Sequence, residues 1–394
     1  MSDRGSRLSL GILLVHAVAV QVVSYALRPS ISYSLLEIGG DGLIIGIAAA
    51  SFAVPPLLLA VPAGRLADRV GERVSLVLGA CALIAACVVA WIGSSSLVGL
   101  VVATSLLGVG VLFSVVGEQA WVMRDATSGR LDASFGLYTL ATSTGQMLGP
   151  VLLLLPGGES KPGAGFIVLA CAAVAVLGFV LSFFVRPNII VRDASASGRE
   201  RMLPEAARLL RRKGVVQALV ASSLVLTSLD LLLAYLPLLA QERGLAPAVL
   251  SAMLIARGFA TMASRFLLGR LTVRFGRRRV LVVTCCAAAV SLSVLAVPVP
   301  VWALITASVA YGFAAGTVQP LTMSWMTLLT PRGQRGVAAS MRLVGNRAGQ
   351  TMLPLAAALL SSASGAAPVF LATGVSLLLA GWLSRVAPNG DQAR

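Results

Sequence analysis

Residues 64–74 read GRLADRVGERV, and a related stretch, GRLTVRFGRRRV, occupies residues 269–280. The first stretch concentrates charge in a chain of which only 12% of the residues are charged. Its five charged side chains are Arg65, Asp68, Arg69, Glu72 and Arg73. We expect Gly64 to allow close helix packing and Gly71 to form a tight turn. The pattern predicts two antiparallel helices joined by a charged turn, once in each half of the chain.

The composition indicates a membrane protein. Of the 394 residues 57% are hydrophobic, and the mean hydropathy is +0.91, whereas a soluble domain is about 45–50% apolar and about 25% charged. The net charge of +16 would suggest nucleic acid as the partner of a soluble protein, but cationic cytoplasmic loops explain it in a membrane protein. We therefore expect a lipid bilayer around the chain and no nucleic-acid partner. The five cysteines lack metal-ligand spacing, so neither a metal site nor a disulfide is predicted.

The apolar runs predict twelve transmembrane helices, because a span needs about 20 mostly apolar residues. The runs lie at 9–34, 42–63, 74–93, 97–119, 132–155, 164–185, 214–240, 247–269, 280–297, 300–328, 337–361 and 366–386. With the N-terminus in the cytoplasm, 24 basic residues fall on cytoplasmic segments and two on external loops. This asymmetry predicts a multi-pass protein of the cell (inner or plasma) membrane with both termini in the cytoplasm.

The chain repeats itself with a period of about half its length. Gly64 matches Gly269 at an offset of 205, and Gly145 to Pro150 matches Gly349 to Pro354 at an offset of 204. The longest polar stretch, 186–213, lies midway. These observations predict an N-terminal six-helix half over 1–185, a cytoplasmic linker over 186–213 and a C-terminal six-helix half over 214–394. Parallel six-helix repeats are an architecture of secondary transporters.

The chain resembles the major facilitator superfamily. GRLADRVGERV is similar to that superfamily's signature between helices two and three, and residues 269–280 resemble its degenerate second copy. Gly145-x-x-x-Gly149-Pro150 on the fifth helix resembles part of a signature of twelve-helix drug and metabolite antiporters. The resemblance implies an all-α fold of two pseudo-symmetric six-helix halves. Thr104 stands where the antiporters carry an arginine on the fourth helix, and the first helix has no acid at mid-membrane.

Eight residues are predicted to gate the cytoplasmic side. By resemblance, Asp68 meets the start of the eleventh helix, near Val337, where the helix dipole is positive, and Arg342 is an added partner. A plain positive-inside anchor is the alternative. Glu118 is expected to pair with Arg65, Arg73 or Arg124, with a proton site as the alternative. The predicted gating residues are Gly64, Asp68, Arg69, Gly71, Arg73, Glu118, Arg265 and Arg342.

Eight further residues form the predicted substrate or proton pathway, because charges inside the hydrocarbon are rare and usually face a cavity. Asp230 is expected either to form a salt bridge with Arg28 or Arg257 or to carry a proton. His16, the only histidine, is either a proton switch or a helix contact. The arginines favour an anionic substrate. The pathway residues are Arg28, Asp230, Arg257, Arg347, Tyr25, Gln146, Asn346 and His16.

The predicted function is secondary active transport by alternating access, as proton-coupled efflux of small amphipathic compounds, including anionic ones. Bending of the fifth and eleventh helices is assigned to Gly145, Gly149, Pro150, Gly349 and Pro354. The alternatives are an organic-anion importer or exchanger, a lipid flippase and a sensor without transport. No nucleotide-binding loop or catalytic constellation is present in the sequence, so we expect neither an enzyme nor a cofactor, only a proton gradient. A monomer is expected.

Overall fold

The computed structural model describes residues 2–125, 131–155, 163–185, 207–330 and 335–387. In these ranges it contains long α-helices and no strand. The helices of the N-terminal part are α1 (Ser2–Glu37), α2 (Gly42–Val70), α3 (Glu72–Ile92), α4 (Leu97–Asp125), α5 (Leu131–Leu148) with the 3₁₀ helix η1 (Gly149–Leu154), and α6 (Ala164–Phe184). They are followed by α8 (Val215–Glu242), α9 (Pro247–Phe275), α10 (Arg277–Ala296), α11 (Val301–Leu329), α12 (Arg335–Ser364), α13 (Ala366–Leu383) and the 3₁₀ helix η3 (Ser384–Val386).

Each predicted span coincides with one of these long α-helices, because the apolar runs are of membrane-spanning length. Ten of them are long and apolar enough to cross a membrane. The other two are α5 and α12. The low hydropathy of α12 follows from the polar side chains that it carries around its middle, Arg342, Asn346, Arg347 and Gln350. The prediction of an all-α membrane fold is confirmed.

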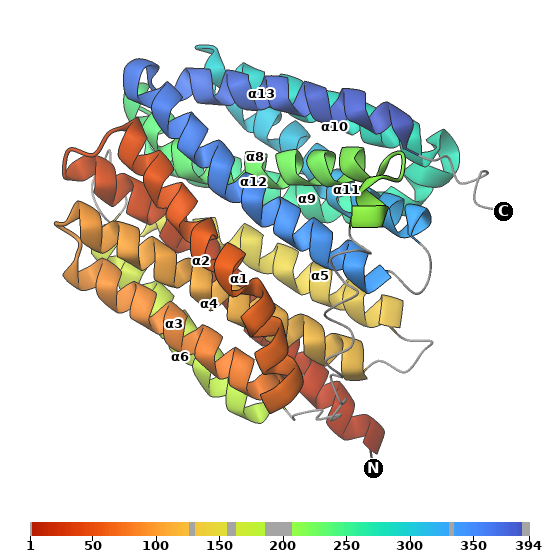
Figure 1. Cartoon of the computed structure of the whole chain (residues 1–394). Coiled ribbons are helices and arrows are strands. Elements are labelled where there is room, and N and C mark those ends of the chain that lie inside the picture. Colours follow the sequence, from red (N-terminus) through yellow and green to blue (C-terminus); the bar gives the residue numbers. More distant parts are fainter. Residues whose placement is uncertain (1, 126–130, 156–162, 186–206, 331–334, 388–394) are drawn as a thin grey trace. The chain divides into compact units, whose positions relative to one another are not determined.

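The described chain divides into two compact units. The first comprises Met1–Arg192 with Leu233–Ile255, and the second Asp193–Leu232 with Ala256–Arg394, so α8 and α9 contribute to both. In the first unit α1 contacts α4, α5 and α6, and α3 lies between α4 and α6 (Figure 1). In the second, α10 contacts α11 and α13, and α12 contacts α13. The division into halves at a linker stays a prediction, and residues 186–206 of that linker lie outside the described residues.

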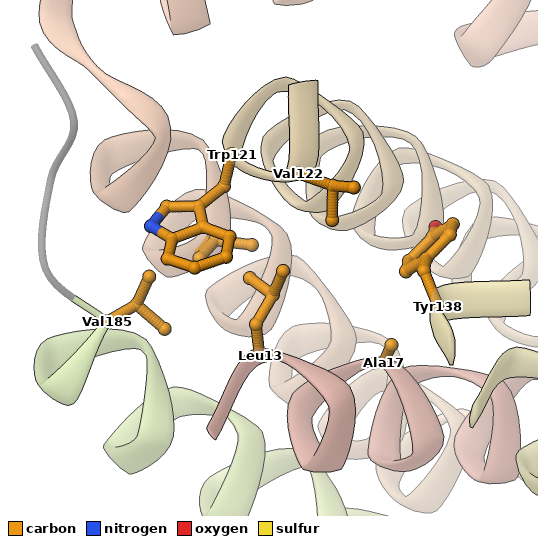
Figure 2. Packing of buried hydrophobic residues seen from close by; sticks show 7 residues of the cluster. Leu13, Ala17, Trp121, Val122, Tyr138 and Val185 are labelled. Carbon is orange, nitrogen blue, oxygen red and sulfur yellow. The ribbon is translucent and has the colours of Figure 1, made fainter. Parts of the chain in front are cut away.

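An apolar cluster in the first unit joins α1, α3, α4 and α5 to the end of α6 (Figure 2). The indole of Trp121 on α4 lies beside Val185 and Leu13, and the ring of Tyr138 lies near Val122 and Ala17. We call this the Trp121 cluster; its buried members are Leu13, Ala17, Leu76, Trp121, Val122, Tyr138 and Val185.

The two units repeat one packing contact. A Cβ atom at Gly108 on α4 would overlap the backbone of Phe52 on α2, and one at Gly312 on α11 would overlap the backbone of Arg257 on α9. The glycines are 204 positions apart and their contact residues 205, which are the two offsets of the sequence repeat. Only glycine permits so close an approach of two helices.

Candidate functional site

The charged stretch at 64–74 is mostly helical. Helix α2 continues through Val70, and the turn is Gly71 alone, with φ 97° and ψ 161°. Gly276 forms the matching turn in the second unit, with φ 78° and ψ 147°. Both conformations favour glycine. A Cβ atom at Gly64 would meet no described atom within 4 Å, so no close contact supports its expected packing role, which stays a prediction.

Arg73 contacts the end of α6. Its guanidinium donates hydrogen bonds to the carbonyl oxygens of Phe183 and Val185, a common way for a basic side chain to satisfy the last carbonyls of a helix. Glu72 beside it is buried, whereas Asp68 and Arg69 are exposed. A latch between Asp68 and α12 would connect the two units, and it stays a prediction.

Glu118 on α4 contacts a histidine and a tyrosine. Its Oε1 lies 2.7 Å from Nδ1 of His16 on α1, and its Oε2 accepts a hydrogen bond of 3.0 Å from the Tyr138 hydroxyl on α5. The expected partner Arg73 instead donates to carbonyls of α6. The Arg124 side chain lies outside the described residues. Glu118 thus has two described partners on neighbouring helices, and its pairing with Arg65 or Arg124 stays a prediction.

Helices α1 and α5 approach closely at two glycines. A Cβ atom at Gly145 would lie 2.5 Å from the Val18 carbonyl oxygen, and one at Gly149 would lie 2.9 Å from the Tyr25 Cβ. Beside them, Gln146 donates a hydrogen bond of 3.4 Å to Gln21. From Gly149 onward the α-helix tightens into the 3₁₀ helix η1, which contains Pro150. A 3₁₀ segment often marks a hinge. This geometry is compatible with the bending role predicted for Gly145, Gly149 and Pro150, which stays a prediction.

Arg28 lies deep in the first unit. It is 7% exposed, and its Cζ lies 4.2 Å from the centre of the Phe52 ring. A guanidinium over an aromatic face is stabilised electrostatically, more strongly when desolvated. Tyr25, also on α1, is buried.

Asp230 in the second unit is part of a polar chain. Gln350 on α12 donates to its Oδ2, and the Gln350 side-chain oxygen accepts a hydrogen bond of 3.1 Å from Arg347. Asp230 is 6% exposed. The amide of Gln350 thus connects the Asp230 carboxylate to the Arg347 guanidinium, which lies one helical turn from Gln350 on α12. The sequence analysis did not pair these residues.

Arg342 on α12, a predicted gating residue, contacts neutral groups. It donates to the Ser222 hydroxyl at 3.0 Å and to the Gln319 side-chain oxygen at 2.7 Å, with further contacts to the Gln319 carbonyl, Thr322 and the Met323 sulfur. Every acceptor described for this guanidinium is uncharged. One turn later Asn346 is buried.

Arg257 on α9 is 1% exposed, and Arg265 is half-buried two turns further. A pair that sequence reasoning missed joins α8 and α11, where the hydroxyls of Ser228 and Tyr311 are 2.7 Å apart. In α12, Gly349 faces Ser223 and Thr227 of α8, and Pro354 lies inside the helix. Gly349 thus repeats the helix contact of Gly145, which the offset of 204 had linked to it.

A profile of the Major Facilitator Superfamily matches residues 13–256 and again 218–393. The chain belongs to the major facilitator superfamily. This transporter is accordingly a multi-pass membrane protein that binds a small-molecule substrate, and it is not an enzyme.

Solved structures with the same fold cover nearly the whole transporter. A D-xylose–proton symporter is 14% identical over 99% of this chain and 98% of its own, with a TM-score of 0.79. The inward open xylose transporter XylE from E. coli is 15% identical over 97% of both chains, with a TM-score of 0.75. The nucleoside transporter NupG is 14% identical over 95% and 98%, with a TM-score of 0.73. At such identities the likeness concerns the fold alone. A comparison with curated protein sequences gave no match.

Proposed function

We propose that this transporter is a proton-coupled secondary active transporter that exports small amphipathic compounds, including anionic ones, by alternating access. It works as a monomer in the cell membrane with both termini in the cytoplasm, where its basic loops favour retention. The proton gradient takes the place of a cofactor.

The observation that carries this proposal is the set of polar side chains on α12 together with Asp230 on α8. These side chains are Arg342, Asn346, Arg347 and Gln350. A carboxylate that is 6% exposed inside a spanning helix is costly as an anion, so it marks an ion or substrate pathway. The neutral amide of Gln350 bridges it to Arg347. Protonation of Asp230 would remove a negative charge from the neighbourhood of Arg347 and so favour an anionic substrate there, and loss of the proton would restore that charge.

An anionic substrate is favoured by Arg342, because neutral acceptors orient a guanidinium without cancelling its charge. A guanidinium matches carboxylate or phosphate with two parallel hydrogen bonds. The same feature supports the second candidate function, import or exchange of an organic anion on the same fold. Export is favoured by the antiporter-like Gly145-x-x-x-Gly149-Pro150 motif, which lies where α5 packs on α1 and tightens into η1.

The test is proton flux in liposomes that contain a pH-sensitive dye. Benzoate, tetraphenylphosphonium and D-xylose are added in turn as anionic, cationic and neutral probes, to the native protein and to Asp230→Asn. Asp41→Asn is the matched control, since Asp41 is an exposed cap of α2 outside the spans. Solute-dependent flux that is lost in Asp230→Asn alone supports coupled transport. Exchange of labelled benzoate without any proton flux would overturn coupling and favour anion exchange.

A further inference from the structure

The three side chains His16, Glu118 and Tyr138 form a closed polar triad inside the first unit. They come from α1, α4 and α5, and their side chains are 0%, 0% and 4% exposed. The Glu118 carboxylate uses both oxygens, one toward His16 Nδ1 and one toward the Tyr138 hydroxyl. A buried carboxylate needs both satisfied oxygens and a neutralising charge; the two neighbours satisfy the oxygens, and His16 supplies the charge when its ring is protonated.

The second ring nitrogen of His16 is the group that remains available. Nε2 is buried and has no hydrogen-bond partner among the described residues. If Nδ1–H donates to Glu118, a proton added to Nε2 turns the ring into an imidazolium and neutralises the carboxylate. Loss of that proton leaves one net negative charge on the buried triad.

We propose that this triad is a proton-binding site of the transport cycle. Water delivers a proton to Nε2 of His16, the product is an imidazolium paired with the Glu118 carboxylate, and release returns the same proton to water. Tyr138 keeps its proton throughout and holds the carboxylate in place. The inference rests on the proposed proton-coupled function, but it assigns a site separate from Asp230.

The Trp121 cluster (Figure 2) shares Tyr138 with the triad and continues next to it along α1 and α4. Leu13 lies one helical turn before His16, and Trp121 and Val122 lie one turn after Glu118. Both the N-terminal direction along α1 and the C-terminal direction along α4 lead to the helix ends that the distribution of basic residues predicts to be cytoplasmic. Protons from that side therefore reach the triad only when this apolar layer opens, as gated coupling requires.

Helix α6 leaves a small space next to Nε2. A Cβ atom at Gly178 would lie 4.0 Å from Nε2 and 3.9 Å from Cδ2 of His16, an ordinary contact distance. A methyl group would thus fit and cover the nitrogen without a clash. Gly178→Ala is for this reason a probe of access to Nε2 that leaves all three triad side chains unchanged.

The helices packed around the triad carry other titratable groups. On α3, Glu72 is buried and Arg73 is bound to the end of α6. In the described part of α6, Ala164–Phe184, the only such group is Cys171. On α1 itself Arg28 lies three turns away, over Phe52. The charged groups at the end of α2 are Arg65, Asp68 and Arg69.

The test uses the single histidine of the chain. The full-length protein, labelled with ¹³C and ¹⁵N in the histidine ring and placed in lipid nanodiscs, is titrated by NMR from about pH 5 to about pH 9, around the range where histidine changes charge. We expect one titration step at Nε2. Glu118→Gln removes the neutralising charge and moves the midpoint down by about one pH unit or more, a tenfold loss of proton affinity. Tyr138→Phe removes a donor to the carboxylate and moves the midpoint up.

Access is measured on the same sample by exchange of the Nε2 proton with water. Gly178→Ala slows this exchange several-fold, whereas the control Gly165→Ala, which meets only the ring of Trp91, leaves it unchanged. The proposal is overturned if the His16 ring stays neutral, with one protonated nitrogen, at every pH. It is also overturned if the ring stays doubly protonated at every pH in the native protein and in both triad variants, Glu118→Gln and Tyr138→Phe. The titration needs no transported solute. If His16 does not titrate, proton flux that depends on Asp230 can still be observed. If no proton flux is observed, the titration of His16 can still be measured.

Discussion

Gly145 and Gly136 offer a direct test of how α5 packs on α1. Both glycines lie in α5. A Cβ atom at Gly145 would lie 2.5 Å from the Val18 carbonyl oxygen and 2.6 Å from the Gln21 Cβ, whereas one at Gly136 would meet no described atom within 4 Å. The same substitution by alanine in the same helix therefore differs only in what the added methyl group meets.

The expected cost follows from these distances. Ordinary contact begins at 3.4 Å, so Gly145→Ala forces the two helices apart by roughly 0.9 Å, and overpacking of this kind typically costs about 1–3 kcal/mol. Gly136→Ala adds no contact and removes backbone freedom from the unfolded chain, which stabilises a helix by roughly 0.5–1 kcal/mol. Gly145→Ala gains the same helix propensity, which cancels in the comparison, so the two variants should differ by about 1–3 kcal/mol in the free energy of unfolding.

The assay is thermal unfolding in detergent, followed by tryptophan fluorescence at a fixed heating rate. For units of 150–250 residues a change of 1 kcal/mol shifts Tm by about 2–4 °C, so Gly145→Ala should unfold roughly 2–12 °C below Gly136→Ala. Equal Tm values for the two variants would refute the close approach of α1 and α5. A loss of Tm in Gly136→Ala alone would contradict the open surroundings of that glycine.

Three further predictions concern stability. Gly71→Ala places a side chain at φ 97° and ψ 161°, which costs about 1–3 kcal/mol and lowers Tm; an unchanged Tm would contradict the single-residue turn. Arg73→Ala removes two hydrogen bonds from the end of α6, at about 0.5–1.5 kcal/mol each, and hydrogen exchange of the last α6 amides should rise while that of α4 does not. Ser228→Ala and Tyr311→Phe, whose hydroxyls are 2.7 Å apart, should be non-additive in a double-mutant cycle by about 0.5–1.5 kcal/mol, and full additivity would exclude the bond.

Local chemistry explains why much of the fold was predictable. Twelve apolar runs gave twelve long helices, since hydropathy and length determine a span without reference to its neighbours. The repeat was also readable, because equivalent contacts such as Gly145 and Gly349 need glycine in both halves. The charged motif revealed the superfamily, but its local shape was misjudged: residues 64–70 continue α2, and only Gly71 turns.

The partners of the polar side chains were decided by tertiary structure. Asp230, Arg342 and Glu118 were recognised from the sequence because charge is expensive within a span. Their contacts were not, since a residue's type and spacing do not state which face of a distant helix it meets. Glu118 and His16 are 102 positions apart and meet only because α4 packs beside α1, while Arg73, the nearer candidate in sequence, is directed to α6 by the turn at Gly71. The sequence by itself determined the spans, the repeat and the cost of each buried charge; the helix packing determined which group neutralises which.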